Sequence, residues 1–228
     1  MRRQGDFVKP LNAVLLMSDA TGSRVCDLAS QAGILLNATS VSDLETLLDA
    51  FSTSKDLLLS FGTSVIVPSG ILRTPGLLAI NVHAASPGYP GRDPHHFAIY
   101  DGVTTYGATI HYMTEAVDAG SIIDTELFDV PPHSTPSALL ELANMAGMTL
   151  IRRFFERYRE GGVPRPIESL VWGKRKSTRK MFMELCQIDP SMSQEEVDRR
   201  YRATAMPGYR NLQINLHGYR FRIEEPVK

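Results

Sequence analysis

The order in which short apolar runs and helical segments follow one another is the feature that most limits how this chain can fold. Three apolar runs alternate with two segments of helical periodicity, in the order 13–17, 19–33, 34–36, 42–51 and 57–62. Strands that alternate with helices in this way form a parallel sheet joined by right-handed crossovers. We therefore expect an α/β fold with a mostly parallel sheet. Residues 1–10, ahead of the first run, are expected to form a loose leader.

This half of the chain has the element order of a Rossmann-type unit, but no G-x-G-x-x-G turn follows its first strand. A dinucleotide is therefore not expected there. After the third strand, residues 62–68 continue in extended form and would expose backbone amides to a cleft. A planar heterocycle could pair with those amides as an edge strand would. A plain connection from strand to helix fits the same residues equally well.

The remaining chain divides at the Gly161-Gly162 pair, which stops a long helix. Before it we expect a helical turn, a strand, a helix, a hairpin and the long helix, over 69–72, 76–83, 94–100, 106–130 and 134–160. After it we expect a helix over 193–204 and a hairpin over 212–223. This hairpin is too small to fold alone and must dock on the main domain or on a partner. The expected domains are 1–162, a catalytic domain, and 163–228, a helix-hairpin extension.

Polar side chains follow the apolar run that ends the fourth strand. Asn81 and His83 are two positions apart, so on a strand they share one face. They stand at its carboxyl end, where open α/β sheets bind ligands. A loop with two prolines and two glycines follows over 84–91, and Asp118 arrives from the hairpin loop. An amide, an imidazole and a carboxylate are the groups that an acyl-transfer site requires.

These motifs together resemble those of one enzyme family. The spaced set Asn81-x-His83, Tyr106-Gly107-x-Thr109-x-His111 and Asp118-x-Gly120 is similar to that of the formyltransferases that use 10-formyltetrahydrofolate. The resemblance covers roughly residues 56–130. It implies a Rossmann-like formyltransferase domain, 10-formyltetrahydrofolate as formyl donor, and no metal. It also implies that His83 is the base, that Asn81 stabilises the oxyanion, and that Asp118 orients His83 and favours its protonated form.

The resemblance also implies where the two substrates bind. The pterin would lie between residues 61–68 and the loop 114–120, against Phe61, Gly62, Thr63, Val65, Ile66, Val67, Thr114, Val117 and Gly120. The acceptor would meet Ser86, Tyr89, Arg92 and His111, although a histidine on a strand, such as His111, is equally compatible with a structural role. Tyr106 and Met113 are expected in the core.

Within the family, the Tyr89-Pro90-Gly91 form of the loop resembles that of amino-sugar and hydroxyornithine enzymes. The segments 206–214 and 218–221 resemble the small C-terminal piece of nucleotide-sugar N-formyltransferases, and the tail is expected to be too short for a tRNA-binding barrel. The expected acceptor is therefore a dTDP- or GDP-linked 4-amino-4,6-dideoxy sugar. The alternatives are hydroxyornithine or another small amine, a formyltetrahydrofolate hydrolase, and a folate-binding protein without turnover.

The charge and composition of the chain limit the classes of partner that it can bind. A net charge of -1 argues against bulk attraction to nucleic acid. From Lys174 onward there are twelve Lys or Arg against seven Asp or Glu, which indicates either a solvated surface or a basic rim for an anionic substrate. His95 and His96 are adjacent on an expected helix and do not face one another, so a metal site is not expected. Two distant cysteines, together with the lack of a secretory signal and of an apolar run of about 20 residues, predict a cytoplasmic protein. The tail and its hairpin, which must dock on another surface, make a homodimer plausible.

Overall fold

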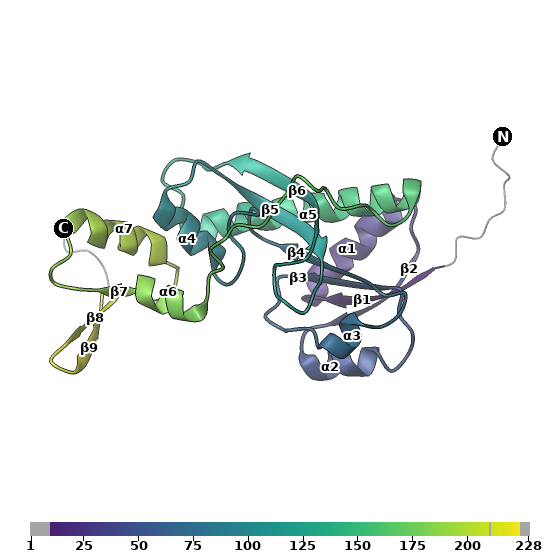
Figure 1. The fold of residues 1–228 in the computed structure, drawn as a ribbon, viewed down its shortest axis with the longest axis horizontal. Helices are drawn as coiled ribbons and strands as arrows, with labels where there is room; N and C mark the ends of the chain where they lie inside the picture. The colour runs from purple at the N-terminus through teal and green to yellow at the C-terminus, as the bar shows by residue number, and fades with distance from the viewer. Residues whose placement is uncertain (1–9, 210, 224–228) are drawn as a thin grey trace.

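The computed structural model describes residues 10–209 and 211–223, and its centre is a six-stranded sheet (Figure 1). The predicted leader lies outside the described residues except for Pro10, as do Arg210 and residues 224–228 of the basic tail. The strands run in the order β2-β1-β3-β4-β5-β6. Strands β1 to β4 are mutually parallel, and β5 runs antiparallel to both of its neighbours, β4 and β6. Their bounds are β1 Leu11–Leu16, β2 Leu36–Val41, β3 Leu57–Phe61, β4 Leu78–His83, β5 Thr105–Tyr112 and β6 Ile122–Asp129.

The parallel sheet predicted from the element order is confirmed, but β2 begins where the predicted strand 34–36 ends. The segment Asn37–Ser40 is polar, and it alternates between exposed and half-buried positions. An edge strand has one neighbour only, so backbone pairing with β1 can hold it without a long apolar run. The central strands β1 and β3 are almost completely buried, which explains why their apolar runs identified them.

Helices cover both faces of this sheet (Figure 1). One face packs against α1 (Asp19–Gln31) and α5 (Pro136–Gly161) through residues such as Val25, Leu150 and Phe155. The other face packs against α2 (Leu44–Ala50) and α3 (Ser69–Leu72) through Leu47 and Ile71. Each core cluster removes a continuous apolar surface from water, which is the main force that holds the layers together.

The last part of the chain docks on α4 (Pro94–Asp101). It contains α6 (Arg179–Leu185), β7 (Gln187–Ile188), α7 (Gln194–Thr204), β8 (Gln213–Leu216) and β9 (Tyr219–Arg222), and the predicted helix and hairpin are both present. His96 Nδ1 donates to the carbonyl of Ala203 on α7 at 2.6 Å, and Phe97 packs against Leu185 and Ala203. The extension therefore reaches the main domain through α7. Helix α5 ends at Gly161, and the division into two domains near that residue stays a prediction.

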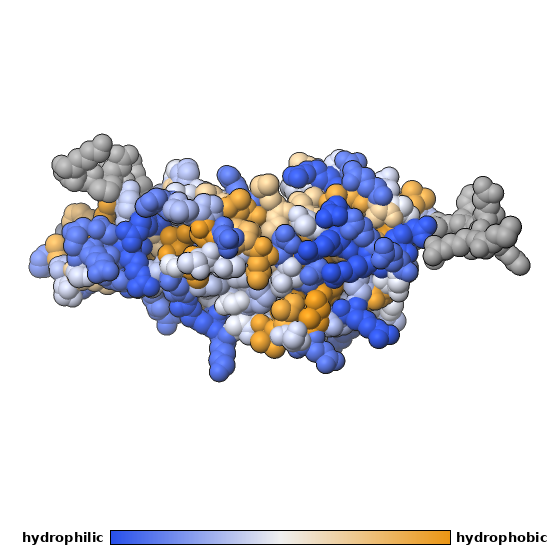
Figure 2. All heavy atoms as spheres, turned by 90° about the horizontal axis from the view of Figure 1, so that it is seen from above, coloured by the Kyte–Doolittle hydropathy of each residue, from blue (hydrophilic) through white to orange (hydrophobic). Residues whose placement is uncertain are grey.

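The surface view shows several separate hydrophobic patches among mostly hydrophilic residues on this face (Figure 2). Among the helices of the described chain, none combines the length and the apolar character needed to cross a membrane.

Candidate functional site

Asn81 and His111 face each other across the pair β4 and β5. His111 Nδ1 lies 2.8 Å from the carbonyl of Tyr112, which can only accept, so Nδ1 carries a proton. In the neutral ring, Nε2 then accepts from the Asn81 amide Nδ2 at 3.1 Å. One amide proton of Asn81 is used in this way, and the other proton and the amide oxygen have no hydrogen-bond partner in the described part of the chain.

The loop between β5 and β6 brings Asp118 to the same place. Asp118 has a φ of 45°, a left-handed conformation, and its side chain is buried with 4% exposed. Two residues later, a Cβ on Gly120 would lie 1.7 Å from the carbonyl oxygen of Tyr112, so this position requires glycine. The Asp-x-Gly motif is therefore a loop that holds one carboxylate in one place.

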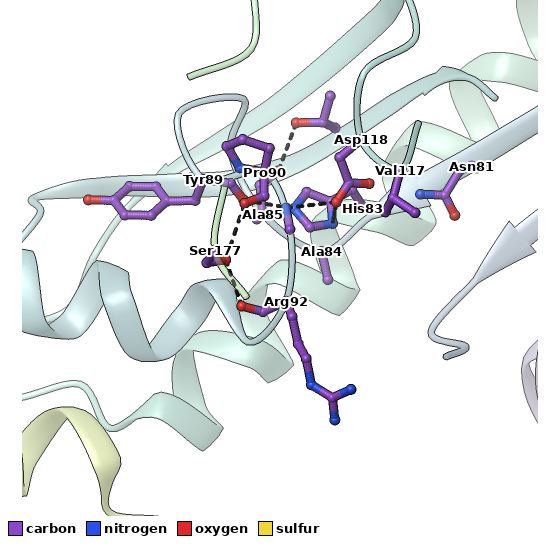
Figure 3. Close-up of polar contacts among 12 residues, drawn as sticks. Asn81, His83, Ala84, Ala85, Tyr89, Pro90, Arg92, Val117, Asp118 and Ser177 are labelled. Carbon is purple, nitrogen blue, oxygen red and sulfur yellow. Dashed lines mark hydrogen bonds and ion pairs between the residues drawn. The ribbon is translucent and has the colours of Figure 1, made fainter. Parts of the chain in front are cut away.

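The Asp118 carboxylate lies between two histidine rings. Its Oδ2 accepts from the backbone N–H of Gly91 at 2.8 Å and lies 3.6 Å from His83 Nδ1. Its Oδ1 lies 3.5 Å from His111 Nε2. The predicted residues Asn81, His83 and Asp118 are thus brought into one cluster, and Figure 3 shows the side chains of His83 and Asp118 pointing toward one another.

The hydrogen bond that orients the His83 ring comes from a different partner than expected. His83 Nε2 donates to the carbonyl of Tyr89 at 2.8 Å, whereas Asp118 lies beyond hydrogen-bond distance from Nδ1. In the neutral ring, Nδ1 therefore carries the lone pair and is the atom that can take a proton. Asp118 therefore faces the ring as an ion-pair partner at 3.6 Å, while the loop 84–91 turns its Tyr89 carbonyl onto the other ring nitrogen, and the orienting role of Asp118 stays a prediction.

Burial lowers the pKa of His83, and this effect outweighs the Asp118 carboxylate and the Tyr89 carbonyl, which both raise it. For Asp118, burial alone would raise the pKa, but the His111 ring 3.5 Å away, the charge of His83 and the Gly91 N–H together hold it below its usual value. At neutral pH the cluster therefore contains a neutral imidazole beside an ionised carboxylate, which would stabilise the imidazolium once a proton arrives.

This cluster lies on the wall of a cavity of about 790 Å³. Seven of the nine residues expected against the pterin line it: Gly62, Thr63, Val65, Ile66, Val67, Thr114 and Val117. Phe61 does not, because its ring points into the core toward α5, where it packs close to Gly147. Gly120 is buried against the Tyr112 backbone and does not line the cavity either.

Of the four residues expected at the acceptor, Arg92 and His111 line the cavity and Ser86 and Tyr89 do not. The Tyr89 phenol donates to Asp101 at 2.9 Å, and its ring points away from His83 (Figure 3). Tyr89 therefore contributes its backbone carbonyl to the site. Tyr106 is in the core as expected. Met113 packs against the core cluster that contains Leu47 and also lines the cavity.

Sequence reasoning missed several residues of the cavity wall. Leu140 and Asn144 come from α5, where their spacing of four places them on one helix face. Asp93 and His95 come from the start of α4. Lys176 and Ser177 come from the segment after α5. The excess of Lys and Arg from Lys174 onward allowed a basic rim as one interpretation, but it did not indicate which of these residues reach the cleft.

This later segment is attached to both loops of the site. The backbone of Ser177 donates to the Pro90 carbonyl at 2.9 Å and accepts from Arg92 N–H at 3.0 Å. The Lys176 ammonium donates to the carbonyl of Val117. Among residues 10–209 and 211–223, no group of three or more His, Cys, Asp or Glu is arranged to hold a metal ion.

Comparison with known proteins adds the family context. Residues 14–152 match a family model described as formyl transferase. Methionyl-tRNA formyltransferase of Listeria monocytogenes is 34% identical over 111 residues, which are 48% of this chain and 35% of that protein. The chain thus spans about a third of the length of that curated relative.

Two solved structures share the fold. A sugar N-formyltransferase from Shewanella sp. superposes with a TM-score of 0.73 and 17% identity, covering 95% of this chain and 98% of that one. HypX from Aquifex aeolicus, solved in complex with tetrahydrofolic acid, superposes with a TM-score of 0.64 and 16% identity, covering 92% of this chain and 36% of that one.

Proposed function

This chain belongs to the formyl transferase family, and we propose that it transfers a formyl group from 10-formyltetrahydrofolate to the amino group of a nucleotide-linked amino sugar. The observation that carries the proposal is the convergence of Asn81, His83 and Asp118 on the wall of one large cavity. The fold of nearly the whole chain, extension included, is shared with a sugar N-formyltransferase, which supports the choice of acceptor.

The cavity suits a pterin on the side formed by residues 63–67. These residues lie outside strands and helices, and no backbone–backbone hydrogen bond joins them to other parts of the described chain. The Val65 N–H donates to the Thr63 side chain at 3.1 Å. The other peptide groups of this segment can bond to the edge of a planar heterocycle, and Val65 and Ile66 offer apolar contact beside them. The expected cofactor residues Gly62, Thr63, Val65, Ile66, Val67, Thr114 and Val117 would hold the donor, which supplies the formyl group.

The catalytic groups would act on the acceptor amine and on the formyl oxygen. An ammonium must lose a proton before its nitrogen can attack a carbonyl carbon, and His83 Nδ1 can take that proton because its pKa lies below the ordinary value. Asp118 would stabilise the resulting imidazolium. When the bond between the formyl carbon and the folate nitrogen breaks, the departing amine would take up a proton, for which the imidazolium is a source. The free amide proton of Asn81 would donate to the oxygen on which negative charge develops, a contribution of about 3 kcal/mol in comparable sites.

The anionic part of the acceptor would meet two cations on the cavity wall. Arg92 is paired with Asp93, whereas Lys176 has no carboxylate within ion-pair distance among the described residues. A nucleotide diphosphate placed there would gain the charge-assisted contacts that phosphate oxygens form with Arg and Lys. Of the two interpretations of the basic C-terminal segment, a solvated surface or a basic rim, we therefore propose the rim, beginning at Lys176.

A homodimer is proposed to form through the hairpin. Leu216, Tyr219 and Phe221 are 44%, 72% and 53% exposed on β8 and β9. Exposed apolar side chains of this kind mark association surfaces. Light scattering on the purified chain would give a dimeric mass if this surface associates, and a monomeric mass would refute it.

The test is an acceptor panel with 10-formyltetrahydrofolate, followed by mass spectrometry. We expect a gain of one formyl group on a dTDP- or GDP-linked amino sugar. Formylation of hydroxyornithine or another small amine, with no formylation of the sugars, would show that the acceptor is that amine. Formate release without any acceptor would indicate a hydrolase. His83→Asn should reduce the transfer rate by about 10²–10⁴-fold, whereas His133→Asn, at an exposed histidine, should not change it.

A further inference from the structure

We propose that Trp172 is a positioning residue of this site, which holds the Asp118 loop and the two imidazoles in their catalytic arrangement. The inference rests on the proposed function, since it assigns a role in that reaction. Trp172 lies beyond residue 152, where the family match ends. It is also the single tryptophan of the chain.

The indole contacts three parts of the cluster. Its Nε1–H donates to the carbonyl of Gly120 at 2.7 Å, two residues from Asp118. Its ring lies edge-on to His111, with centroids 4.9 Å apart and planes at 89°. It also lies edge-on to His83, with centroids 5.9 Å apart and planes at 64°. One side chain therefore bonds the loop that carries the carboxylate and packs against both rings that face it.

The backbone around Trp172 is fixed on both sides. Ile167 N–H donates to the carbonyl of Ile122 at 2.8 Å, and Gly173 N–H donates to the carbonyl of Pro87 at 2.8 Å. A Cβ at position 173 would lie 2.3 Å from the carbonyl oxygen of Gly88, so only glycine allows this close approach. The segment is thus joined to β6 and to the loop after His83, and the indole is placed between them.

These contacts have two consequences for the reaction. The bond to Gly120 restrains the loop and with it the distance between Asp118 and His83 Nδ1. The indole also occupies space beside both imidazoles, so water that would otherwise solvate the rings is excluded. A drier and more rigid cluster strengthens the interaction of the carboxylate with the imidazolium. A tryptophan that only filled the core would stabilise the fold without affecting the charge of His83.

Two substitutions separate the contribution of the indole hydrogen bond from that of the aromatic packing. Trp172→Phe keeps an aromatic ring against the histidines but removes the donor to Gly120, and Trp172→Ala removes both. We expect kcat to fall by roughly 3–10-fold in the first variant and by more than about 10-fold in the second. Val171→Ala changes the adjacent side chain, which is 73% exposed, and serves as the matched control with unchanged kcat.

The readout specific to positioning is the titration of His83. The charged or titratable groups around it are Asp118, His111 and His95. Burial has a larger effect on the pKa of His83 than the Asp118 charge has. If water reaches the ring in Trp172→Ala, this pKa therefore rises toward its ordinary value, even though the interaction with Asp118 weakens, and the acid limb of kcat/KM moves to higher pH by roughly 0.5–1 unit. NMR titration of labelled histidines should show the same displacement in the full chain, and Trp172→Phe should show a smaller one.

The outcomes distinguish this inference from the proposed function. If the midpoint of unfolding falls but neither the acid limb nor the NMR titration moves in either variant, Trp172 is a packing residue and the inference is wrong. If no acceptor on the panel is formylated and the NMR titration still moves, the proposed function fails while the positioning role of Trp172 stands.

Discussion

His83 Nδ1 lies 3.6 Å from Oδ2 of Asp118, and the two side chains are 11% and 4% exposed. This distance is too long for a hydrogen bond and short enough for a strong interaction between charges. The orientation of the ring comes from the Tyr89 carbonyl, 2.8 Å from the other ring nitrogen. Orientation and charge stabilisation of the imidazole are therefore supplied by two different groups from two different loops.

Asp118→Asn would separate these two effects. The amide oxygen can still accept from Gly91 N–H, but the negative charge that raises the pKa of His83 is lost. The pKa of His83 should therefore fall further, and the acid limb of kcat/KM should move to lower pH by about 1 unit, the reverse of the shift expected for Trp172→Ala. We expect kcat to fall by roughly 10–100-fold because the imidazolium is less stable.

Measurement of initial rates between pH 5 and 9 (roughly the range of a histidine base) checks this prediction. Asp129→Asn removes an exposed carboxylate at the end of β6 and should leave the profile unchanged. A profile that moves to higher pH in Asp118→Asn would contradict the assigned role of the carboxylate.

His95 should make the fold sensitive to acid. Burial lowers its pKa to about 3, and its Nδ1 has no hydrogen-bond partner among the described residues. Because the folded pKa lies below the unfolded value of about 6.5, this contribution to stability is complete above pH 6.5 (roughly the unfolded pKa) and is lost as the pH falls toward 3. Between pH 7.5 and 5 the loss is about 2 kcal/mol.

Urea unfolding at these two pH values checks the effect of His95. The variant His95→Phe has no imidazole to protonate at this position. Between pH 7.5 and 5 (the two values compared above), its free energy of unfolding should therefore fall by about 2 kcal/mol less than that of the wild type. His133→Asn should behave like the wild type, because His133 is exposed. An equal acid sensitivity of His95→Phe and the wild type would show that other groups, such as the buried His96, cause it.

Lys176→Met should weaken binding of an anionic acceptor. The ammonium lies on the cavity wall and is bonded to the Val117 carbonyl. An exposed ion pair contributes up to about 1 kcal/mol, so KM for a nucleotide-linked amino sugar should rise about 5-fold. An amine without phosphate should show no such rise. Lys174→Met, two residues away and outside the cavity wall, is the matched control. Equal changes in the two lysine variants would refute the assignment.

Gly120→Ala should destabilise the fold and displace Asp118. The added Cβ would lie 1.7 Å from the Tyr112 carbonyl oxygen, so the loop must move. We expect a loss of about 3 kcal/mol in the free energy of unfolding. Gly70→Ala, at a helical position with open space around it, should change this free energy by less than about 1 kcal/mol. A stable Gly120→Ala with full activity would show that the loop tolerates a different path.

The sequence by itself determined the parallel sheet and the three side chains that we propose to be catalytic. Apolar runs such as Leu57–Phe61 are buried on both faces, and the spacing of Asn81 and His83 places both on one strand end. The carboxylate Asp118 could be assigned because a local loop motif, Asp118-x-Gly120, carries it. Periodicity and short motifs record these features because each is decided by residues close together in the chain.

Only the tertiary structure decided which atoms meet around the imidazole. No local pattern in the sequence indicates that the Tyr89 carbonyl faces His83 or that the Phe61 ring points into the core. Nor does one indicate that Trp172 and Lys176, which follow the long helix, reach the site. Each depends on contacts between segments far apart in the chain, which hydrophobic periodicity does not encode. The residues proposed to carry the chemistry could therefore be predicted from the sequence. The groups that orient and shield the imidazole could not, because they depend on how the chain after α5 packs against the cleft.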